Sequence, residues 1–103
     1  MRNMLVLINK AVNRYDLEDV LEFHIDGHTK NTCLFFCADG FNRETLENFC
    51  DKNGMNYVPF NEDKFYDVIK QWNINSCVCF GTKSIYNFAL QFFKKKKVTH
   101  VER

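Results

Sequence analysis

Short apolar runs alternate along the chain with segments in which apolar residues recur at every third or fourth position. Apolar runs of strand length occur at residues 4–8, 32–38, 57–60, 76–80 and 98–101. Helical spacing joins Leu17 to Val20 and Leu21, Leu46 to Phe49 and Cys50, Phe65 to Val68, Ile69 and Trp72, and Ile85 to Phe88, Ala89 and Phe92 or Phe93. These two periodicities predict the element order βαβαβαβαβ.

Turn and capping residues mark the ends of the predicted helices. The first helix stops near Gly27, and Asn53-Gly54 ends the second as a C-cap. Asn61 or Asp63 can cap the third helix. The lysines at 94–97 are expected to close the last helix, where they would face the negative end of its dipole.

The character of the strands predicts their places in the sheet. The run at residues 4–8 is apolar throughout, which suits a central strand covered by helices on both faces. Pro59 removes a hydrogen-bond donor and therefore suggests an edge or a strand end. Connections this short require right-handed crossovers. We therefore expect a single Rossmann-like α/β domain, spanning residues 1–103, with three layers and a mainly parallel sheet of about five strands.

Composition narrows the class of protein further. The chain has 103 residues with 14 Lys and Arg against 13 Asp and Glu, and 16% of its residues are aromatic. Such a chain folds, and its net charge of +1 gives no general attraction to nucleic acid or membranes. Only the lysines at 94–97 form a strongly basic run. They suit a nucleic acid backbone, although a solvated helix end is the commoner role of such a run.

The cysteines predict a reducing environment. Cys33, Cys37, Cys77 and Cys79 lie inside apolar runs, which favours buried free thiols over a disulfide or zinc set. We expect no metal, no cofactor, no secretion signal and no membrane span, and hence a cytoplasmic location. Frequent Asn, Lys, Phe and Tyr also suggest an AT-rich genome such as that of a phage.

The loop after the fourth strand is the most informative candidate site. Ligands of open α/β sheets bind at the carboxyl ends of the strands, where the strand order reverses. Here Gly81, Thr82, Lys83 and Ser84 combine backbone N–H groups, hydroxyls and a cation at a helix start, which suits an anion such as phosphate. The P-loop and dinucleotide spacings are absent. The alternative is a plain turn and helix cap with a solvated lysine.

Two further loops follow strands and join the candidate site. The first supplies Asn9, Lys10 and Arg14, and the second supplies Asp39, Gly40, Asn42 and Arg43. Their bases and amides can hold a phosphate through charge-assisted hydrogen bonds, although ordinary surface polarity explains them as well. Asp16 and Asp39 are the only carboxylates suited to acid-base chemistry, and neither has a histidine partner at readable spacing. No catalytic residue is identified.

The segment Gly81-Thr82-Lys83-Ser84-Ile85, with Ala89 and the later run Lys95 to Val98, resembles the closing segment of the SLOG superfamily. These are small Rossmann-like domains that include the DprA-like and YspA-like groups. The turn Ala38-Asp39-Gly40 with Asn42 is similar to the superfamily's second loop. Cys37 and Asn42 depart from that loop, because the superfamily has Gly and Asp there. The segment used for phosphoribohydrolase catalysis in some members is absent.

The resemblance implies a binding pocket for a nucleotide or a nucleotide-derived ligand, with residues 81–84 at its phosphate end and Asn9, Gly40 and Asn42 lining it. The alternative is a small phage-type interaction protein that modulates a host protein through an exposed apolar patch and has lost the ligand. Phe41, Tyr86, Phe92 or Phe93 would belong to that patch. A homodimer is compatible with either function, and nucleic acid is the less favoured partner.

Overall fold

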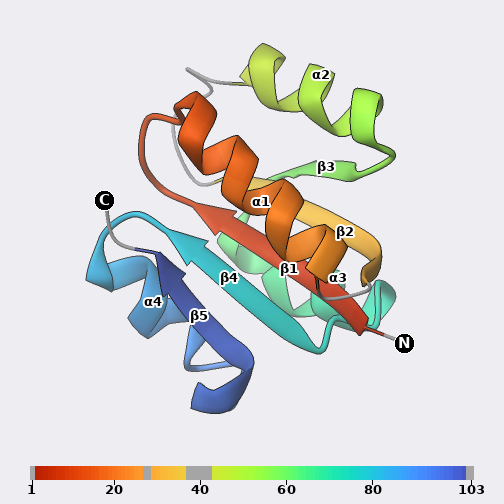
Figure 1. Ribbon diagram of the computed structural model, residues 1–103. Helices are drawn as coiled ribbons and strands as arrows, with labels where there is room; N and C mark the ends of the chain where they lie inside the picture. Colours follow the sequence, from red (N-terminus) through yellow and green to blue (C-terminus); the bar gives the residue numbers. More distant parts are fainter. Residues whose placement is uncertain (1, 27–28, 37–42, 102–103) are drawn as a thin grey trace.

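The computed structural model describes residues 2–26, 29–36 and 43–101 and contains one five-stranded sheet (Figure 1). Its strands are β1 (Arg2–Ile8), β2 (Thr29–Phe36), β3 (Asn56–Pro59), β4 (Ser76–Phe80) and β5 (Val98–Val101). All neighbouring strands pair in parallel, in the order β3-β2-β1-β4-β5. The predicted α/β class, the central position of the first strand and the edge position of the third are thus confirmed.

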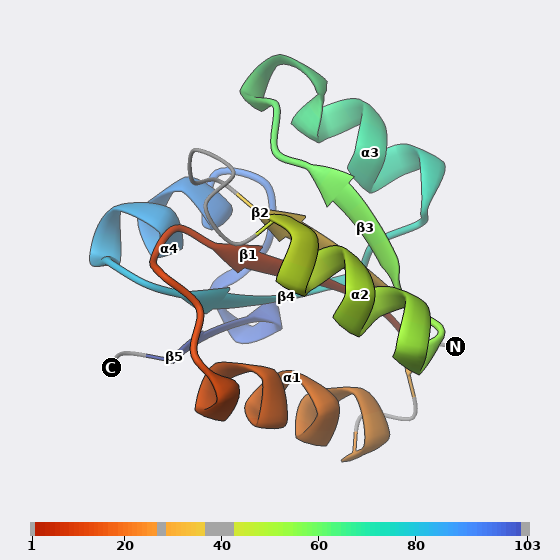
Figure 2. The same ribbon diagram turned by 90° about the horizontal axis from the view of Figure 1, so that it is seen from above.

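Helices cover both faces of the sheet. They are α1 (Arg14–Asp26), α2 (Arg43–Asn53), α3 (Phe65–Gln71) and α4 (Lys83–Ala89), and two short 3-10 helices, η1 (Glu62–Lys64) and η2 (Lys95–Lys97), precede α3 and β5. Figure 2 shows α1 and α2 on one side of the sheet and α3 and α4 on the other. This three-layer arrangement is Rossmann-like, as the alternating pattern predicts.

The apolar run of β1 supplies both halves of the core. Met4, Val6 and Ile8 pack with Val20 and Leu46 on the side of α1 and α2. The alternate positions of the same strand face α3 and α4, because successive side chains of a strand point to opposite faces. Every residue from 4 to 8 is at most 1% exposed, which explains why this run shows no polar alternation.

Aromatic packing joins α3 to α4. The ring of Phe65 is fully buried and lies 4.9 Å from the ring of Phe88 and 4.7 Å from that of Phe92, measured between centroids. Phe60, which follows β3, lies 5.8 Å from Phe88. The tilted and edge-to-face contacts among these rings are the favourable geometries for aromatic pairs. The loop after β3 is thereby held against α4.

Two predicted boundaries are corrected. The second strand begins at Thr29 rather than residue 32, because its polar start pairs with the backbone of β1 although hydrophobicity does not mark it. The last helix ends at Ala89 and is not closed by the lysines. The backbone N–H groups of Phe92 and Phe93 both donate to the carbonyl oxygen of Ala89. The resulting tight turn places the Phe92 ring against Phe65.

Four described cysteines, Cys33, Cys50, Cys77 and Cys79, are free and buried, as expected, whereas Cys37 lies outside the described residues. Burial raises the pKa of the Cys33 thiol to about 12, with a further contribution from Cys50. Burial likewise raises the pKa of Cys50 to about 12, helped by the charges of neighbouring acidic residues. These thiols therefore stay protonated at neutral pH. No group of metal-ligating side chains and no helix able to cross a membrane occurs in the described parts of the chain.

Candidate functional site

The strand order fixes where the loops meet. The chain leaves β1 for α1 on one face of the sheet, and it leaves the adjacent β4 for α4 on the other face. The loops that follow these two strands therefore diverge and open a crevice at their carboxyl ends. Asn9 follows β1 at this point, and Gly81 and Thr82 follow β4.

Asn9 ties these two loops together. Its backbone N–H donates to the carbonyl oxygen of Phe80 at 3.2 Å. Its side-chain Oδ1 accepts from the backbone N–H of Thr82 at 3.1 Å, and its Nδ2 donates to the Thr82 Oγ1 at 3.1 Å. A single amide side chain thus satisfies a backbone donor and a hydroxyl of the opposite loop, which sets the separation of the two loops.

Gly81 is required for this close approach. Its φ is +133°, a backbone conformation that L side chains rarely adopt, and a Cβ built there would lie 1.8 Å from Asn9 Oδ1. Any other residue must both strain the backbone and displace the Asn9 amide. The His100 ring of β5 approaches the Gly81 carbonyl oxygen at 3.0 Å through Nε2 and supports the loop from the other side.

The remaining residues of the loop after β4 face outward at the start of α4. The hydroxyls of Thr82 and Ser84 are 2.6 Å apart and hydrogen-bond to each other. Lys83 is exposed. The structure therefore brings Asn9, Gly81, Thr82 and Ser84 into one cluster, with Lys83 beside it.

Lys10 does not face this cluster as an unpaired cation. Its Nζ lies 3.1 Å from Asp16 Oδ2, and the Asp16 side chain is fully buried. Asp16 also accepts from the backbone N–H of Asn13, while Asn13 Oδ1 accepts from the backbone N–H of Asp16. This reciprocal pair is a capping box at the start of α1, and the Lys10 ammonium neutralises its carboxylate.

Arg14 contacts its neighbour Tyr15 in α1. Its guanidinium lies over the ring of Tyr15, 5.0 Å from the centroid, and donates to the Tyr15 hydroxyl at 3.2 Å. Arg43 pairs with Glu47 on the surface of α2. Three further candidates, Asp39, Gly40 and Asn42, lie outside the described residues.

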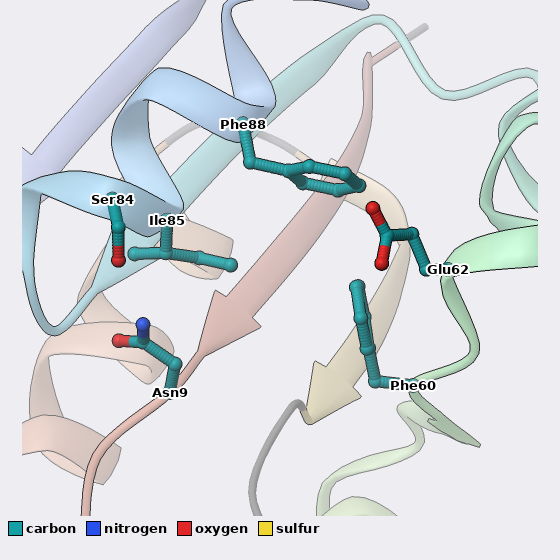
Figure 3. Close-up of a pocket in the computed structure, with 6 residues that line it drawn as sticks. All are labelled: Asn9, Phe60, Glu62, Ser84, Ile85 and Phe88. Carbon is teal, nitrogen blue, oxygen red and sulfur yellow. The ribbon is translucent and has the colours of Figure 1, made fainter.

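A cavity of about 190 Å³ opens beside the Asn9 cluster (Figure 3). The residues that line it come from the loops after β1 and β3, from the start of η1 and from the first turns of α4: Asn9, Phe60, Glu62, Ser84, Ile85 and Phe88. Figure 3 shows the Ile85 side chain between Asn9 and the rings of Phe60 and Phe88. The Glu62 carboxylate lies between these two rings, on the side of the cavity away from Asn9. The cavity is thus mainly apolar, with polar groups on two sides.

Phe60, Glu62, Ile85 and Phe88 are lining residues that sequence reasoning did not assign to the site. The sequence places Ile85 and Phe88 on the apolar face of a helix and Phe60 at the end of a strand. A helical pattern shows that a side chain faces inward, but it does not show that the helix end stands beside a cavity. The position of Phe60 and Glu62 directly after a predicted parallel strand was the available signal.

No protein-family model, no curated protein and no solved structure matches this chain.

Proposed function

We propose that the protein is a binding module for a nucleotide or a nucleoside-type ligand, held in the cavity beside Asn9. The observation that carries the proposal is a mainly apolar cavity with a few convergent polar groups, at the switch point of a Rossmann-like sheet. The resemblance of residues 81–89 to SLOG domains supports the same class of ligand.

The size and lining of the cavity favour a planar ring inside it. Its volume of about 190 Å³ is smaller than the roughly 300–1,000 Å³ of most ligand pockets, so a base fits better than a whole nucleotide. Phe60 and Phe88 offer ring contacts, while Asn9 and Ser84 offer hydrogen bonds to the edge of the base. The Glu62 carboxylate suits hydroxyl or amino donors.

A phosphate, where the ligand has one, would lie outside the cavity near Lys83. Lys10 is already paired with the Asp16 carboxylate, so this cation would contribute little to it. The proposed ligand therefore depends more on its base and hydroxyls than on its charge. The buried reduced thiols support a cytoplasmic setting for this function.

Thermal unfolding against a panel of nucleosides, nucleotides and cyclic dinucleotides tests the proposal. A ligand that binds only the folded state must raise the melting temperature, and the stabilisation grows with the logarithm of the ligand concentration over Kd. We expect a nucleoside and its monophosphate to stabilise the protein to a similar extent. Titration calorimetry with the best compound then gives the Kd.

Matched variants locate the binding. Glu62→Gln should weaken the binding of a hydroxyl-bearing ligand about tenfold, which corresponds to the replacement of one charged hydrogen bond by a neutral one. Asp63→Asn, the neighbouring exposed carboxyl of η1 that does not line the cavity, should leave the Kd unchanged. No stabilisation by any compound of the panel, or equal effects of the two variants, would contradict the proposal.

The alternative function as an interaction protein gains no specific support from the described residues. Of the aromatic residues expected in its surface patch, Tyr86 is half-buried and stacks on the His100 ring at 5.1 Å. Phe93 is also half-buried, and Phe92 is 36% exposed. Phe41 lies outside the described residues.

A further inference from the structure

A concentrated basic segment lies at the opposite end of the sheet from the cavity. After α4 the chain turns through residues 90–93 and enters η2, which lies at the amino ends of β4 and β5 (Figure 1). Lys94 to Lys97 are all exposed, and none forms an ion pair with a residue in the described ranges. The segment is thus separate from the proposed nucleotide site.

The backbone holds these four charges close together. The N–H of Lys97 donates to the carbonyl of Lys94 at 2.8 Å, so the run is compacted into one 3-10 turn. Without these four lysines the chain would have 10 basic and 13 acidic residues, a formal charge of −3. The balanced net charge of +1 therefore hides a strongly uneven distribution, with a local positive field that attracts polyanions.

Compensation of a helix dipole does not account for the run. That effect acts within the last turn of a helix, and α4 ends at Ala89, five residues before Lys94. The lysines instead belong to a separate short turn that leads into the edge strand β5. The simplest structural explanation for four consecutive like charges is thereby removed.

An exposed aromatic ring stands next to the lysines. Phe92 is 36% exposed, and it is one of the few large apolar side chains exposed in the described residues. Its other side packs on the rings of Phe65 and Phe88, at centroid distances of 4.7 and 5.3 Å. Because the core holds it, the ring can offer a surface to a partner with little loss of side-chain entropy.

We propose that residues 92–97 bind single-stranded nucleic acid, with phosphates on Lys94 to Lys97 and a base stacked on Phe92. A positive segment beside an aromatic platform is the combination by which proteins bind single strands without sequence preference. A duplex keeps its bases stacked on one another and would use only the lysines. An anionic membrane or an acidic protein would need the charge but not the flat ring.

Fluorescence anisotropy with a labelled oligo(dT) tests the proposal on the full chain. About four phosphate contacts predict a log–log salt slope near −2.8, or roughly 50-fold weaker binding in 200 mM than in 50 mM salt. Phe92→Leu, which keeps an apolar contact with Phe65, should weaken binding at least about fivefold because stacking is lost. Phe92→Tyr should retain it.

Charge variants provide the matched control. Replacing Lys95, Lys96 and Lys97 by Gln should reduce the salt slope to about −0.7, as one remaining contact predicts. The same change at exposed Lys52 and Lys64 should leave affinity and slope nearly unchanged. Binding unaffected by the η2 variants, equal affinity of wild type and Phe92→Leu, or tighter binding to phosphatidylserine vesicles than to oligo(dT) would each overturn the proposal.

Discussion

The two ends of the sheet differ in whether their polar side chains are bonded within the protein or exposed to solvent. At the carboxyl end, Asn9 bridges the loops after β1 and β4, and Lys10 neutralises the buried Asp16. At the amino end of β5, four lysines stand in solvent without an ion pair to a described residue. Asn9 and Asp16 thus hold the framework together at the first end, whereas the four lysines at the second end remain available to a partner.

The same contrast shows that a cation in a candidate loop is not necessarily available to a ligand. The cations Lys10 and Arg14, which the sequence suggests for ligand binding, are engaged with neighbours in their own loop and helix. The lysines at 94–97, which resemble an ordinary helix end, are exposed and form no ion pair with a described residue. Variants of Asp16 and Gly81 should therefore change stability, whereas charge variants of Lys95, Lys96 and Lys97 should change binding alone.

The largest effect is expected at Asp16. Asp16→Ala removes a fully buried carboxylate, its capping-box bond from the Asn13 backbone N–H and the Lys10 ion pair. We expect a loss of about 3 kcal/mol in the free energy of unfolding, at the lower end for a broken buried pair because Lys10 can reach water. Urea unfolding measures it. A loss below about 1 kcal/mol would show that the pair does not hold the first loop.

The next effect is expected at Gly81. Gly81→Ala should cost about 2 kcal/mol, since it combines an unfavourable φ with displacement of the Asn9 amide. Gly54→Ala is the matched control: φ there is +68°, but the added Cβ meets nothing within 4 Å. In an Asn9→Ala background Gly81→Ala should cost clearly less. A double-mutant cycle without this coupling would refute the proposed contact.

A smaller effect is expected from alkaline pH. The pKa values of Cys33 and Cys50 are raised from 9.0 to about 12, so the folded state retains protons that the unfolded state loses above pH 9. Stability is then complete below pH 9 and falls as pH rises toward 12, by roughly 1 kcal/mol for each thiol between pH 8 and 10. Cys50→Ala should flatten this profile in urea unfolding at the two pH values. An unchanged slope would contradict it.

The smallest effect on stability is expected at the other end of the sheet. Replacing Lys95, Lys96 and Lys97 together by Gln should change the free energy of unfolding by less than about 0.5 kcal/mol, because exposed side chains without partners contribute little. Thermal and urea unfolding check this. A marked destabilisation would mean that these lysines also belong to the framework, and the contrast between the two ends would fail.

The sequence predicted the fold better than the site for a physical reason. Apolar runs such as residues 4–8 report burial directly, so the central strand and the alternating layers could be inferred from them. The meeting of Asn9 with residues 81–82 also followed, because parallel strands end at one edge of the sheet.

Contacts that depend on the paths of loops could not be inferred. The Lys10 and Asp16 side chains approach each other only because the loop folds back onto the start of α1. Phe60 and Glu62 line the cavity because the Phe60 ring packs against Phe88 of α4. Spacing in the sequence does not encode that packing. The end of α4 at Ala89 likewise depends on the tight turn that places the Phe92 ring against Phe65.

The central position of β1 also governs the order in which the chain can fold. One side of this strand pairs early with β2, but its other side must wait for β4, as in the contact between Asn3 and Asn75, 72 residues apart. During synthesis, the first strand therefore keeps one open edge until most of the chain has left the ribosome. Closure of so long a loop is slow, which makes the pairing of β1 with β4 the natural late step of folding.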